Sequence, residues 1–444
     1  MPRVFWYLRW TRLFRSDMLK KYINPSRSDW AELCRRAEQD NSLIAERVAA
    51  IVDQVINFGD AALLALAAEI DGVQLPQLQV TAAEIEQASR DVSDDVKTAI
   101  EVAVKNISAF HQAQMPREVR VQTMPGVECV QRPVAISRVG LYIPGGTAPL
   151  FSTVLMLALP AKIAGCGEVI MCTPTDKQGR VAAEVLYAAQ RCGVDKIFKV
   201  GGAQAIAAMA YGTGVIPKVD KIFGPGNRYV TIAKQLVSGR NTSIDMPAGP
   251  SEVMVMADES ADVRFVAADM LSQAEHGRDS QAIVVCNSEA LADAVAEEVE
   301  RQAAALSRGE YVKESLAHSR AIVFDCRADM IDFANTYAAE HLIVAMQDAW
   351  DVVDQITAAG SIFVGNYSPE SAGDYASGTN HTLPTSGWAR SCSGVNVDSF
   401  MRKITIQELS QEGLKSLSPT IVTMAAAEGL EAHANAVRVR TSEE

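Results

Sequence analysis

From Val139 onward, short β-branched segments alternate with alanine-rich helical segments, and this alternation restricts the fold more than any other feature. The first group of strand-like segments is VGLYI, EVIMCT, KIFKV, VDKIF and SEVMVMA, and the second is QAIVVC, RAIVFD, LIVAM and SIFVG. Helical segments such as VAAEVLYAAQRC and LADAVAEEVERQAAAL lie between them. Strands and helices that alternate at this spacing form parallel sheets covered by helices. The sequence therefore predicts an α/β protein with two incomplete Rossmann-like domains in tandem.

The expected boundaries of these domains are 136–251 for the first and 252–384 for the second. Residues 22–135 form a helical N-terminal part, which we expect to pack with the second α/β domain. Its signals are a capping box at Thr81–Glu84, a hairpin around Met124–Gly126, and a helical stripe of Ile44, Val48, Ile51, Val52 and Val55. Residues 385–444 are predicted to form a mostly helical tail without a core of its own. A tail of this kind usually packs on another domain or subunit.

Residues 1–21 differ from the rest because they combine six Lys and Arg residues with bulky aromatic residues. Arg9 and Arg12 interrupt the apolar stretch that a signal peptide needs. We therefore expect 1–21 to be a disordered extension, with the native start at Met18 and no function in Met1–Asp17.

Charge and cysteine content restrict the partners and the compartment. The net charge of −13 opposes binding to nucleic acid. No apolar run approaches the ~20 residues that cross a bilayer. The eight cysteines include no CxxC pair, which is typical of reduced thiols in a reducing compartment. We expect a cytoplasmic protein that binds neither nucleic acid nor a membrane.

Two histidines lie in patterns that suit chemistry. His276 is expected to end the helix ADVRFVAADMLSQAEH just before Gly277, and Gln273 lies three residues earlier on the same face, which suits a metal site at a helix end. A surface histidine that interacts with the helix dipole would show the same pattern. Glu340 and His341 lie between a helix and a strand, where a carboxylate can tune an imidazole for proton transfer. A chance pair in a solvated turn remains the alternative. His111 and His318 are interpreted as structural or solvated.

A long polar segment, 366–385, follows the strand SIFVG and is expected at the carboxyl edge of the sheet, where ligands bind. Its length and glycine content are typical of functional or disordered loops. Asp374 is a candidate metal ligand in this segment, and His381 is a candidate substrate contact.

Glycine-rich turns follow several strands of the first α/β domain, at 142–146, 201–204 and 224–227. Backbone N–H groups at such turns can bind phosphate. None of these turns has the GxGxxG pattern, so each also fits an ordinary tight turn. A similar turn at 247–251 joins the two domains.

Seven of these segments together resemble the histidinol dehydrogenase family. They are VGLYIPGGTAPLFSTVLMLA, VGGAQAIAA, KVDKIFGPGN, DMPAGPSEV, LSQAEHGRDSQ, YAAEHL and SPESAGDYASGTNHTLPT. The resemblance extends from about Trp30 to about Val439, and agreement over seven ordered segments is far more specific than any single motif. The N-terminal extension matches nothing in the family pattern.

The resemblance implies NAD-dependent oxidation of L-histidinol through L-histidinal to L-histidine, the end of histidine biosynthesis, by a homodimer with one Zn²⁺ per subunit. The implied zinc ligands are Gln273, His276, Asp374 and His433, the last supplied by the partner chain. His341 is the implied base and Glu340 the residue that activates water. Implied substrate contacts are Ser251, His381 and Glu428, in addition to His341 and the zinc ligands, and implied NAD contacts are Tyr142, Gln204 and Asn227. The substrate's imidazole and amine suit a zinc ion that holds it beside the nicotinamide.

Three other interpretations use the same residues. A dehydrogenase on the same scaffold could oxidise another small polar alcohol, such as a sulfonated diol, although His381 and Glu428 suit a cationic imidazole-bearing ligand. A zinc hydrolase could use Glu340 to activate metal-bound water, and it would form no NADH. A binding protein without catalysis would not need candidate residues at every site.

Overall fold

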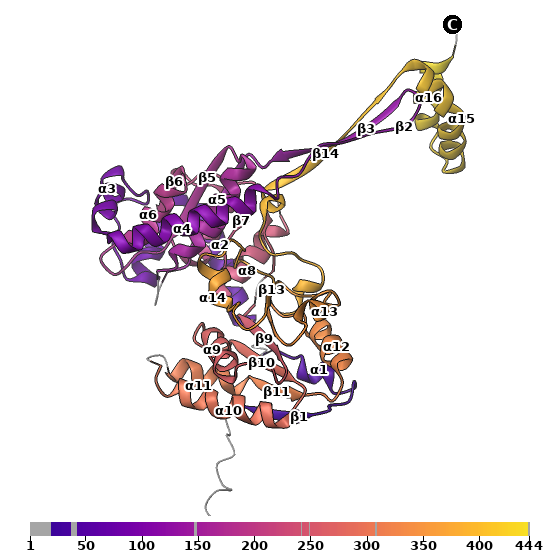
Figure 1. Cartoon of the computed structure of the whole chain (residues 1–444). Helices are drawn as coiled ribbons and strands as arrows, with labels where there is room; N and C mark the ends of the chain where they lie inside the picture. The colour runs from indigo at the N-terminus through magenta and orange to yellow at the C-terminus, as the bar shows by residue number, and fades with distance from the viewer. Residues whose placement is uncertain are drawn as a thin grey trace, which may run out of the picture.

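The computed structural model describes residues 19–36, 42–145, 149–240, 242–247, 249–306 and 309–442. Two parallel sheets form the body, and a three-stranded antiparallel arm projects from it and ends in two helices (Figure 1). The predictions for Met1–Asp17 and for a start at Met18 concern residues outside this described part. The predicted extension over 1–21 is wrong for Lys20 and Lys21, because both belong to strand β1 (Lys20–Ile23), which pairs with a strand of the second sheet.

The first sheet has the strand order β6-β5-β4-β7-β8, and all its strands are parallel. Its strands are β4 (Arg138–Tyr142), β5 (Glu168–Thr173), β6 (Lys196–Lys199), β7 (Lys221–Phe223) and β8 (Ser243–Ile244). Its helices are α5 (Phe151–Ala164), α6 (Ala183–Arg191), α7 (Gly202–Tyr211) and α8 (Arg228–Ser238). The prediction of a first parallel α/β domain is confirmed, although SEVMVMA, grouped with it, lies in the second sheet.

The second sheet has the order β1-β11-β10-β9-β12-β13. Its further strands are β9 (Glu252–Ala257), β10 (Gln281–Cys286), β11 (Arg320–Val323), β12 (His341–Ala345) and β13 (Ser361–Val364). Its helices are α9 (Val263–Ala274), α10 (Glu289–Ala303), α11 (Gly309–Ala317), α12 (Arg327–Tyr337) and α13 (Ala349–Val353). When β1 is left aside and the strands of each unit are numbered in chain order, both sheets have the strand order 3-2-1-4-5. The tandem prediction is confirmed, and the two units share one plan.

The N-terminal part divides between the two units. Its helices are α1 (Trp30–Leu33), α2 (Ser42–Leu66), which continues as the π-helix η1 (Ala67–Asp71), α3 (Ala82–Asp91) and α4 (Asp94–Gln112). Trp30 packs with Met254 in the core of the second unit. Val48 on α2 packs instead with Ile222 of the first sheet, and Ile100 on α4 packs with Leu141. The prediction that 22–135 packs with the second unit is therefore wrong for α2–α4, whose apolar stripes cover the first sheet.

Helix α2 with η1 contains an apolar stretch that, by length and composition, could cross a membrane, contrary to the expectation from the sequence. In the structure its face with Val48, Val52 and Val55 is buried in the core of the first unit. The helical path is interrupted at Gly59, whose φ of 54° lies in the left-handed region. Buried core helices of this kind can meet the same criterion of length and composition.

The arm is built from a hairpin and a strand from the far end of the chain. The predicted hairpin is confirmed as β2 (Val119–Met124) and β3 (Val127–Ala135). The third strand is β14 (Met401–Leu409), which pairs with all of β3 in antiparallel register. This segment was predicted to be helical, and that prediction is wrong because the alternation of Ile404 and Ile406 matches a strand with a partner.

Two helices close the chain at the end of the arm, α15 (Gln411–Ala427) and α16 (Glu431–Thr441), as the prediction of a mostly helical tail requires. The first part of 385–444 does have a core, contrary to expectation. Phe400 is fully buried and stacks on Phe223 of β7, with ring centroids 4.0 Å apart. The tail therefore starts inside the first unit and leaves it through β14.

Candidate active site

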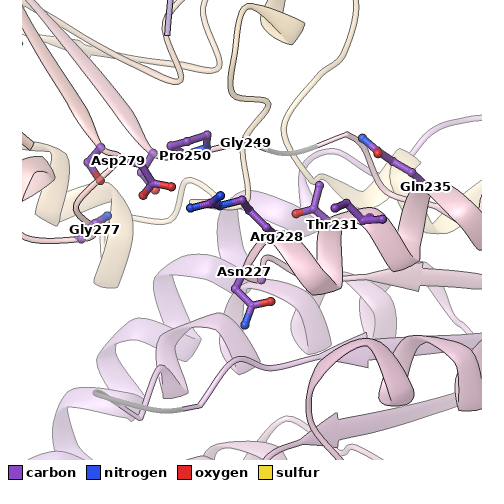
Figure 2. A pocket seen from close by; sticks show the side chains of 13 residues that line it. Asn227, Arg228, Thr231, Gln235, Gly249, Pro250, Gly277 and Asp279 are labelled. Atoms are coloured by element: carbon purple, nitrogen blue, oxygen red, sulfur yellow. The ribbon is translucent and has the colours of Figure 1, made fainter. Parts of the chain in front are cut away.

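A pocket of about 530 Å³ lies between the two units. The first unit contributes the loop after β7 and the start of α8, including Asn227 and Arg228. The second unit contributes Ser251, directly before β9, and His276, two residues after the end of α9. Figure 2 shows Arg228 extending from α8 toward Pro250 and Asp279 on the other side. The pocket therefore faces the carboxyl edge of the first sheet and the amino edge of the second.

Glu340 and His341 lie at this amino edge, because His341 is the first residue of β12. Helix α12 ends at Tyr337, and Ala338 adopts a left-handed conformation (φ 55°) that turns the chain into the strand. Gly360 fits closely against them, since a Cβ there would lie 2.5 Å from the Glu340 carbonyl oxygen. The expectation that the site lies at the carboxyl edge of this sheet is wrong. The segment 366–385 starts at that edge, but it returns to the opposite one.

The return is made by a short helix, α14 (Glu370–Tyr375), within the segment expected to be a loop. Glu370 and Asp374 lie one turn apart on it and both approach the His341 ring. His341 Nδ1 lies 3.8 Å from Glu370 Oε1 and 3.7 Å from Glu340 Oε2, and Nε2 lies 3.7 Å from Asp374 Oδ1. Three carboxyl groups thus surround one buried imidazole.

A candidate cation-binding cluster lies beside this imidazole and consists of His276, Glu370 and Asp374. Each offers a ligand atom, and these atoms all lie within 4.8 Å of one another. Gln273 joins them from α9, with its Nε2 3.1 Å from His276 Nδ1. Nitrogen and carboxylate oxygen ligands of this kind suit zinc and other divalent transition metals.

Several buried polar atoms in and beside the cluster would suit a bound cation. Among the described residues, Gln273 Oε1 and both carboxylate oxygens of Glu370 are buried without a hydrogen-bond partner, as are both ring nitrogens of His341. Buried polar atoms are almost always paired, since an unpaired one costs free energy. The donor set and these unpaired atoms therefore fit a bound metal ion.

Burial and the neighbouring carboxyl groups set the protonation of Glu340 and His341 in the chain without metal. Burial raises the pKa of Glu340 to about 8, although the His341 ring and the Glu252 N–H act in the opposite direction. Burial alone lowers the pKa of His341, but Glu370, Glu340 and Asp374 outweigh it and raise the pKa to about 10. For Asp374, burial favours the neutral form, yet the nearby His341 ring leaves the pKa lowered. Bound positive charge would oppose this field.

Residues 34–441 match the profile of the family described as histidinol dehydrogenase. The chain belongs to the histidinol dehydrogenase family. It is 56% identical over 419 residues to histidinol dehydrogenase of Bacteroides fragilis, covering 94% of this chain and 98% of the relative. It is 53% identical over 412 residues to the Escherichia coli K12 enzyme, covering 92% of this chain and 94% of the relative. 

The fold agrees with a solved member of the family. The crystal structure of histidinol dehydrogenase from Elizabethkingia anophelis matches with a TM-score of 0.93 at 47% identity, covering 95% of this chain and 98% of that one. The two tandem units, the arm and the terminal helices are therefore the architecture of a histidinol dehydrogenase family member.

His381 links the two units of this family member near the cluster. Its Nδ1 lies 2.9 Å from the Asp374 carbonyl oxygen, which can only accept, so Nδ1 carries a proton. Its Nε2 lies 3.2 Å from the Thr153 hydroxyl on α5. Burial lowers the pKa of His381, which favours a neutral ring with Nε2 as the acceptor.

The predicted NAD contacts lie at the carboxyl edge of the first sheet. The Gly202 N–H donates to the Tyr142 hydroxyl over 3.1 Å, and Gln204 is buried on the helix that follows. Asn227 caps α8 and lines the pocket. The turn at Gly224 requires glycine, because a Cβ there would lie 2.1 Å from the Tyr142 carbonyl oxygen.

Glu428 and His433 are not brought to this site within one chain. Both are exposed, one at the end of α15 and one on α16, at the tip of the arm (Figure 1). Glu370 is the opposite case, since it was not predicted as a site residue and the structure places it in the cluster. Its spacing of four residues from Asp374 was the available signal, because two such residues share a face once the segment is helical.

Proposed function

We propose that this chain is a zinc- and NAD-dependent oxidoreductase that oxidises L-histidinol through L-histidinal to L-histidine, the final steps of histidine biosynthesis. The observation that carries the proposal is the buried His341 imidazole, enclosed by three carboxyl groups beside a cation-binding cluster. A base and a carboxyl group next to each other supply the proton transfers that both oxidations need.

Zinc, one ion per subunit, would be held by Gln273, His276 and Asp374, with His433 from a second copy of the chain as the fourth ligand. Glu370 lies close enough to His276 and Asp374 to take part in the same cluster. A zinc ion here would hold the imidazole and amine of the substrate and polarise the reacting oxygen. The mixed nitrogen and oxygen donors are typical of a working metal site, whereas structural sites are usually rich in cysteine.

NAD would bind along the carboxyl edge of the first sheet, near Tyr142, Gln204 and Asn227. In this sheet the chain adds β5 and β6 on one side of β4, and then β7 and β8 on its other side. The switch point lies between β4 and β7, and ligands of α/β sheets bind at such a point. Tyr142 ends β4 and the turn to Asn227 follows β7, so both flank the switch point. NAD would supply the hydride acceptor, and each of the two oxidations would reduce one NAD.

In the first oxidation His341 takes the proton of the substrate hydroxyl group as the carbinol carbon loses hydride. His341 can accept this proton only in its neutral form. Because Glu370 and Asp374 favour the protonated ring, nearby positive charge must balance their field. In the second oxidation Glu340 takes a proton from the water that adds to the aldehyde, and a second hydride leaves. Ser251, which lines the pocket, and His381, which lies beside Asp374, would contact the substrate.

A homodimer is the expected assembly. Glu428 and His433 lie at the tip of the arm, away from the site of their own chain (Figure 1). They would complete a site only if the arm crosses to a second molecule. The arm also exposes apolar side chains, including Val119 (53% exposed) and Val121 (50%). Exposed apolar surface of this kind is typical of an interface. The swapped tail would bring Glu428 to the substrate and His433 to the zinc of the second copy.

The protein is expected in the cytoplasm. All eight of its cysteines, which lie in the described part of the chain, are free, and four of them are buried. Unpaired, buried thiols suit a reducing compartment.

The test is to count NADH formed for each L-histidinol consumed, with and without a chelator. The proposal expects two NADH per substrate and loss of turnover after metal removal. NADH formed from a sulfonated diol and none from histidinol would favour the alternative dehydrogenase. Hydrolysis without NADH would indicate a zinc hydrolase.

A further inference from the structure

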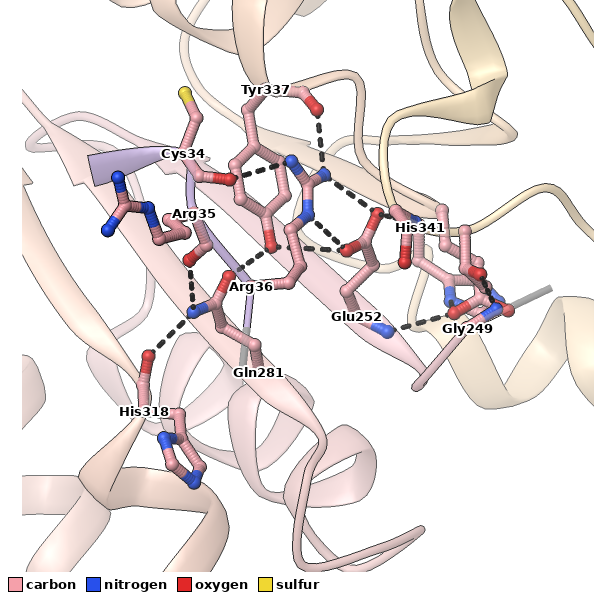
Figure 3. Close-up of polar contacts among 12 residues, drawn as sticks. Cys34, Arg35, Arg36, Gly249, Glu252, Gln281, His318, Tyr337 and His341 are labelled. Atoms are coloured by element: carbon pink, nitrogen blue, oxygen red, sulfur yellow. Dashed lines mark hydrogen bonds and ion pairs between the residues drawn. The ribbon is translucent and has the colours of Figure 1, made fainter. Parts of the chain in front are cut away.

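A second buried charge cluster, formed by Arg36 and Glu252, lies outside the candidate cation-binding cluster (Figure 3). Arg36 pairs in two-pronged fashion with Glu252, with Nε–Oε2 at 2.7 Å and Nη2–Oε1 at 2.9 Å. The two side chains are 14% and 1% exposed. Arg36 comes from the N-terminal segment after α1, and Glu252 is the first residue of β9. The pair therefore joins the beginning of the chain to the edge of the sheet that carries the site.

Arg36 is also fixed by the end of helix α12. Its Nη2 donates to the Tyr337 carbonyl oxygen over 2.7 Å, and its Cζ lies 3.7 Å from the centroid of the Tyr337 ring. A further bond goes to the Cys34 carbonyl oxygen at 2.9 Å. Tyr337 itself donates its hydroxyl proton to Gln281 of β10 over 2.6 Å. A planar guanidinium held this way has little freedom to move.

Glu252 also contacts Glu340, so the position of the Arg36–Glu252 pair affects the Glu340 carboxyl group. The main-chain N–H of Glu252 donates to Glu340 Oε2 over 2.9 Å. The Glu252 side chain also accepts from the Ser386 N–H over 3.1 Å. Ser386 in turn packs closely on the turn before β9, since a Cβ on Gly249 would lie 2.2 Å from Ser386 Oγ. Glu252 thus fixes the Glu340 carboxyl group and one wall of the site together.

We propose that Arg36 and Glu252 are positioning residues for Glu340, an inference that rests on the role of Glu340 in the proposed function. The pair holds the start of β9 where its N–H orients the carboxyl group toward the reacting water. Desolvation of two charges offsets much of their attraction, so a buried pair contributes little net stability. Its main effect here is to fix the atoms around Glu340, and a displacement of about 1 Å can lower a rate about 100-fold.

The test compares the two oxidations in Arg36→Met and Glu252→Gln, using single-turnover measurements that start from histidinol or from histidinal. Each variant should slow histidinal oxidation about 100-fold, with a smaller loss in histidinol oxidation. The KM values and the zinc content should stay within about twofold of wild type. Arg36→Lys, which keeps the charge without the two-pronged contact, should recover part of the rate.

Single variants leave one buried charge unpaired and could fail to fold. The double variant Arg36→Met/Glu252→Gln removes both charges, and it should fold and remain as slow as either single variant. Losses that instead multiply in the double variant would show that the residues do not act as a pair, and would overturn the proposal.

Arg320→Met is the matched control. Arg320 donates to the Leu33 carbonyl oxygen over 2.8 Å, so it ties the same N-terminal segment to the second unit. Among the described residues, its hydrogen bonds do not include Glu252 or Glu340. The control should lower the melting temperature and keep the ratio of the two rates. The same selective loss in Arg320→Met, or unchanged rates in Arg36→Met, would overturn the proposal.

If the wild-type protein formed no NADH from histidinol, the proposed function would be contradicted. Crystal structures would still test the positioning role. Crystal structures of wild type and of Arg36→Met/Glu252→Gln should differ in the contact between the residue 252 N–H and Glu340. Retention of this contact at 2.9 Å in the variant would overturn the positioning role independently of any substrate.

Discussion

Glu370 and His341 lie 3.8 Å apart in the core of the site, although they come from a helix and a strand on different parts of the chain. Glu370 is 1% exposed, and its oxygens have no hydrogen-bond partner among the described residues. Among the groups that raise the pKa of His341, Glu370 acts most strongly. This residue therefore connects the proposed base to the proposed metal.

Glu370→Gln should lower both metal affinity and the pKa of His341. Loss of a charged partner in or around a metal site typically reduces affinity about 10- to 100-fold. Metal content after dialysis measures the first effect, and an NMR titration of His341 measures the second. Glu275→Gln, on the neighbouring end of α9, is the control. An unchanged metal content would exclude Glu370 from the cluster.

Glu340→Gln should slow oxidation of histidinal to histidine far more than oxidation of histidinol, because the amide cannot take a proton from water. A rate loss of about 100-fold or more in the second step is expected, in the range of general-base catalysis. Rapid mixing with each substrate separates the steps. Equal losses in both steps would remove the assignment of Glu340 to the water.

His276→Ala should abolish tight zinc binding, since it removes the only imidazole of the His276–Glu370–Asp374 cluster. The measurement is metal content by mass spectrometry together with chelator competition. His318→Ala, at an exposed position on the same unit, should keep full metal content. Full zinc occupancy in His276→Ala would contradict its role as a ligand.

Deletion of Glu428–Glu444 should inactivate the enzyme if a second copy completes each site. Mixed dimers offer a sharper test than deletion. Inactive His433→Ala and inactive Glu340→Gln subunits, unfolded and refolded together, should recover up to about a quarter of wild-type activity, because each mixed dimer has one intact site. Absence of recovery in verified mixed dimers, or an active truncation, would contradict the swapped tail.

The metal-free protein should lose stability as pH rises from about 5 to about 9. The pKa of Glu340 is raised from 4.5 to about 8, and that of His341 from 6.5 to about 10. Both groups therefore keep protons in the folded state over intervals where the unfolded chain has released them. The free energy of unfolding falls with pH when the folded state binds more protons. Asp374, whose pKa is lowered, opposes this trend only at acidic pH.

Thermal unfolding in chelator across this pH range checks the prediction. The melting temperature should fall with pH, and Glu340→Gln should flatten the part of the curve below pH 8. Saturating zinc should reduce the slope for wild type. If the melting temperature in chelator rose between pH 5 and pH 9, Glu340 and His341 would not keep their protons in the folded state as predicted.

Much of the body could be predicted because periodicity is a local signal. The strands of both sheets and the apolar stripe of α2 follow from the spacing of β-branched and aliphatic residues. The hairpin around Gly126 follows from turn chemistry, and the capping box at Thr81 is confirmed by reciprocal bonds with Glu84. These features depend on residues close together in sequence.

The errors concern long-range pairing. Strand β14 was missed because it forms only against β3, more than 260 residues earlier in the chain. The polar segment 366–385 hides α14, because Gly373 and Ser371 weaken its helical pattern, and with it the position of Glu370. The position of His341 at the start of its strand could be inferred from the sequence, but the approach of Glu370 and Asp374 to it could not, since that depends on the path of α14 back across the sheet.

The shared order of strands gives each unit a switch point between its first and fourth strands, where α/β sheets bind ligands. In the first unit this point lies between β4 and β7, beside Tyr142. In the second it lies between β9 and β12, where the Asp258 carboxyl group accepts from the backbone N–H groups of Ser260 and Gln347 at 3.0 and 2.9 Å. These N–H groups already have an acceptor within the chain, so under the proposed function we expect one NAD site per chain, in the first unit.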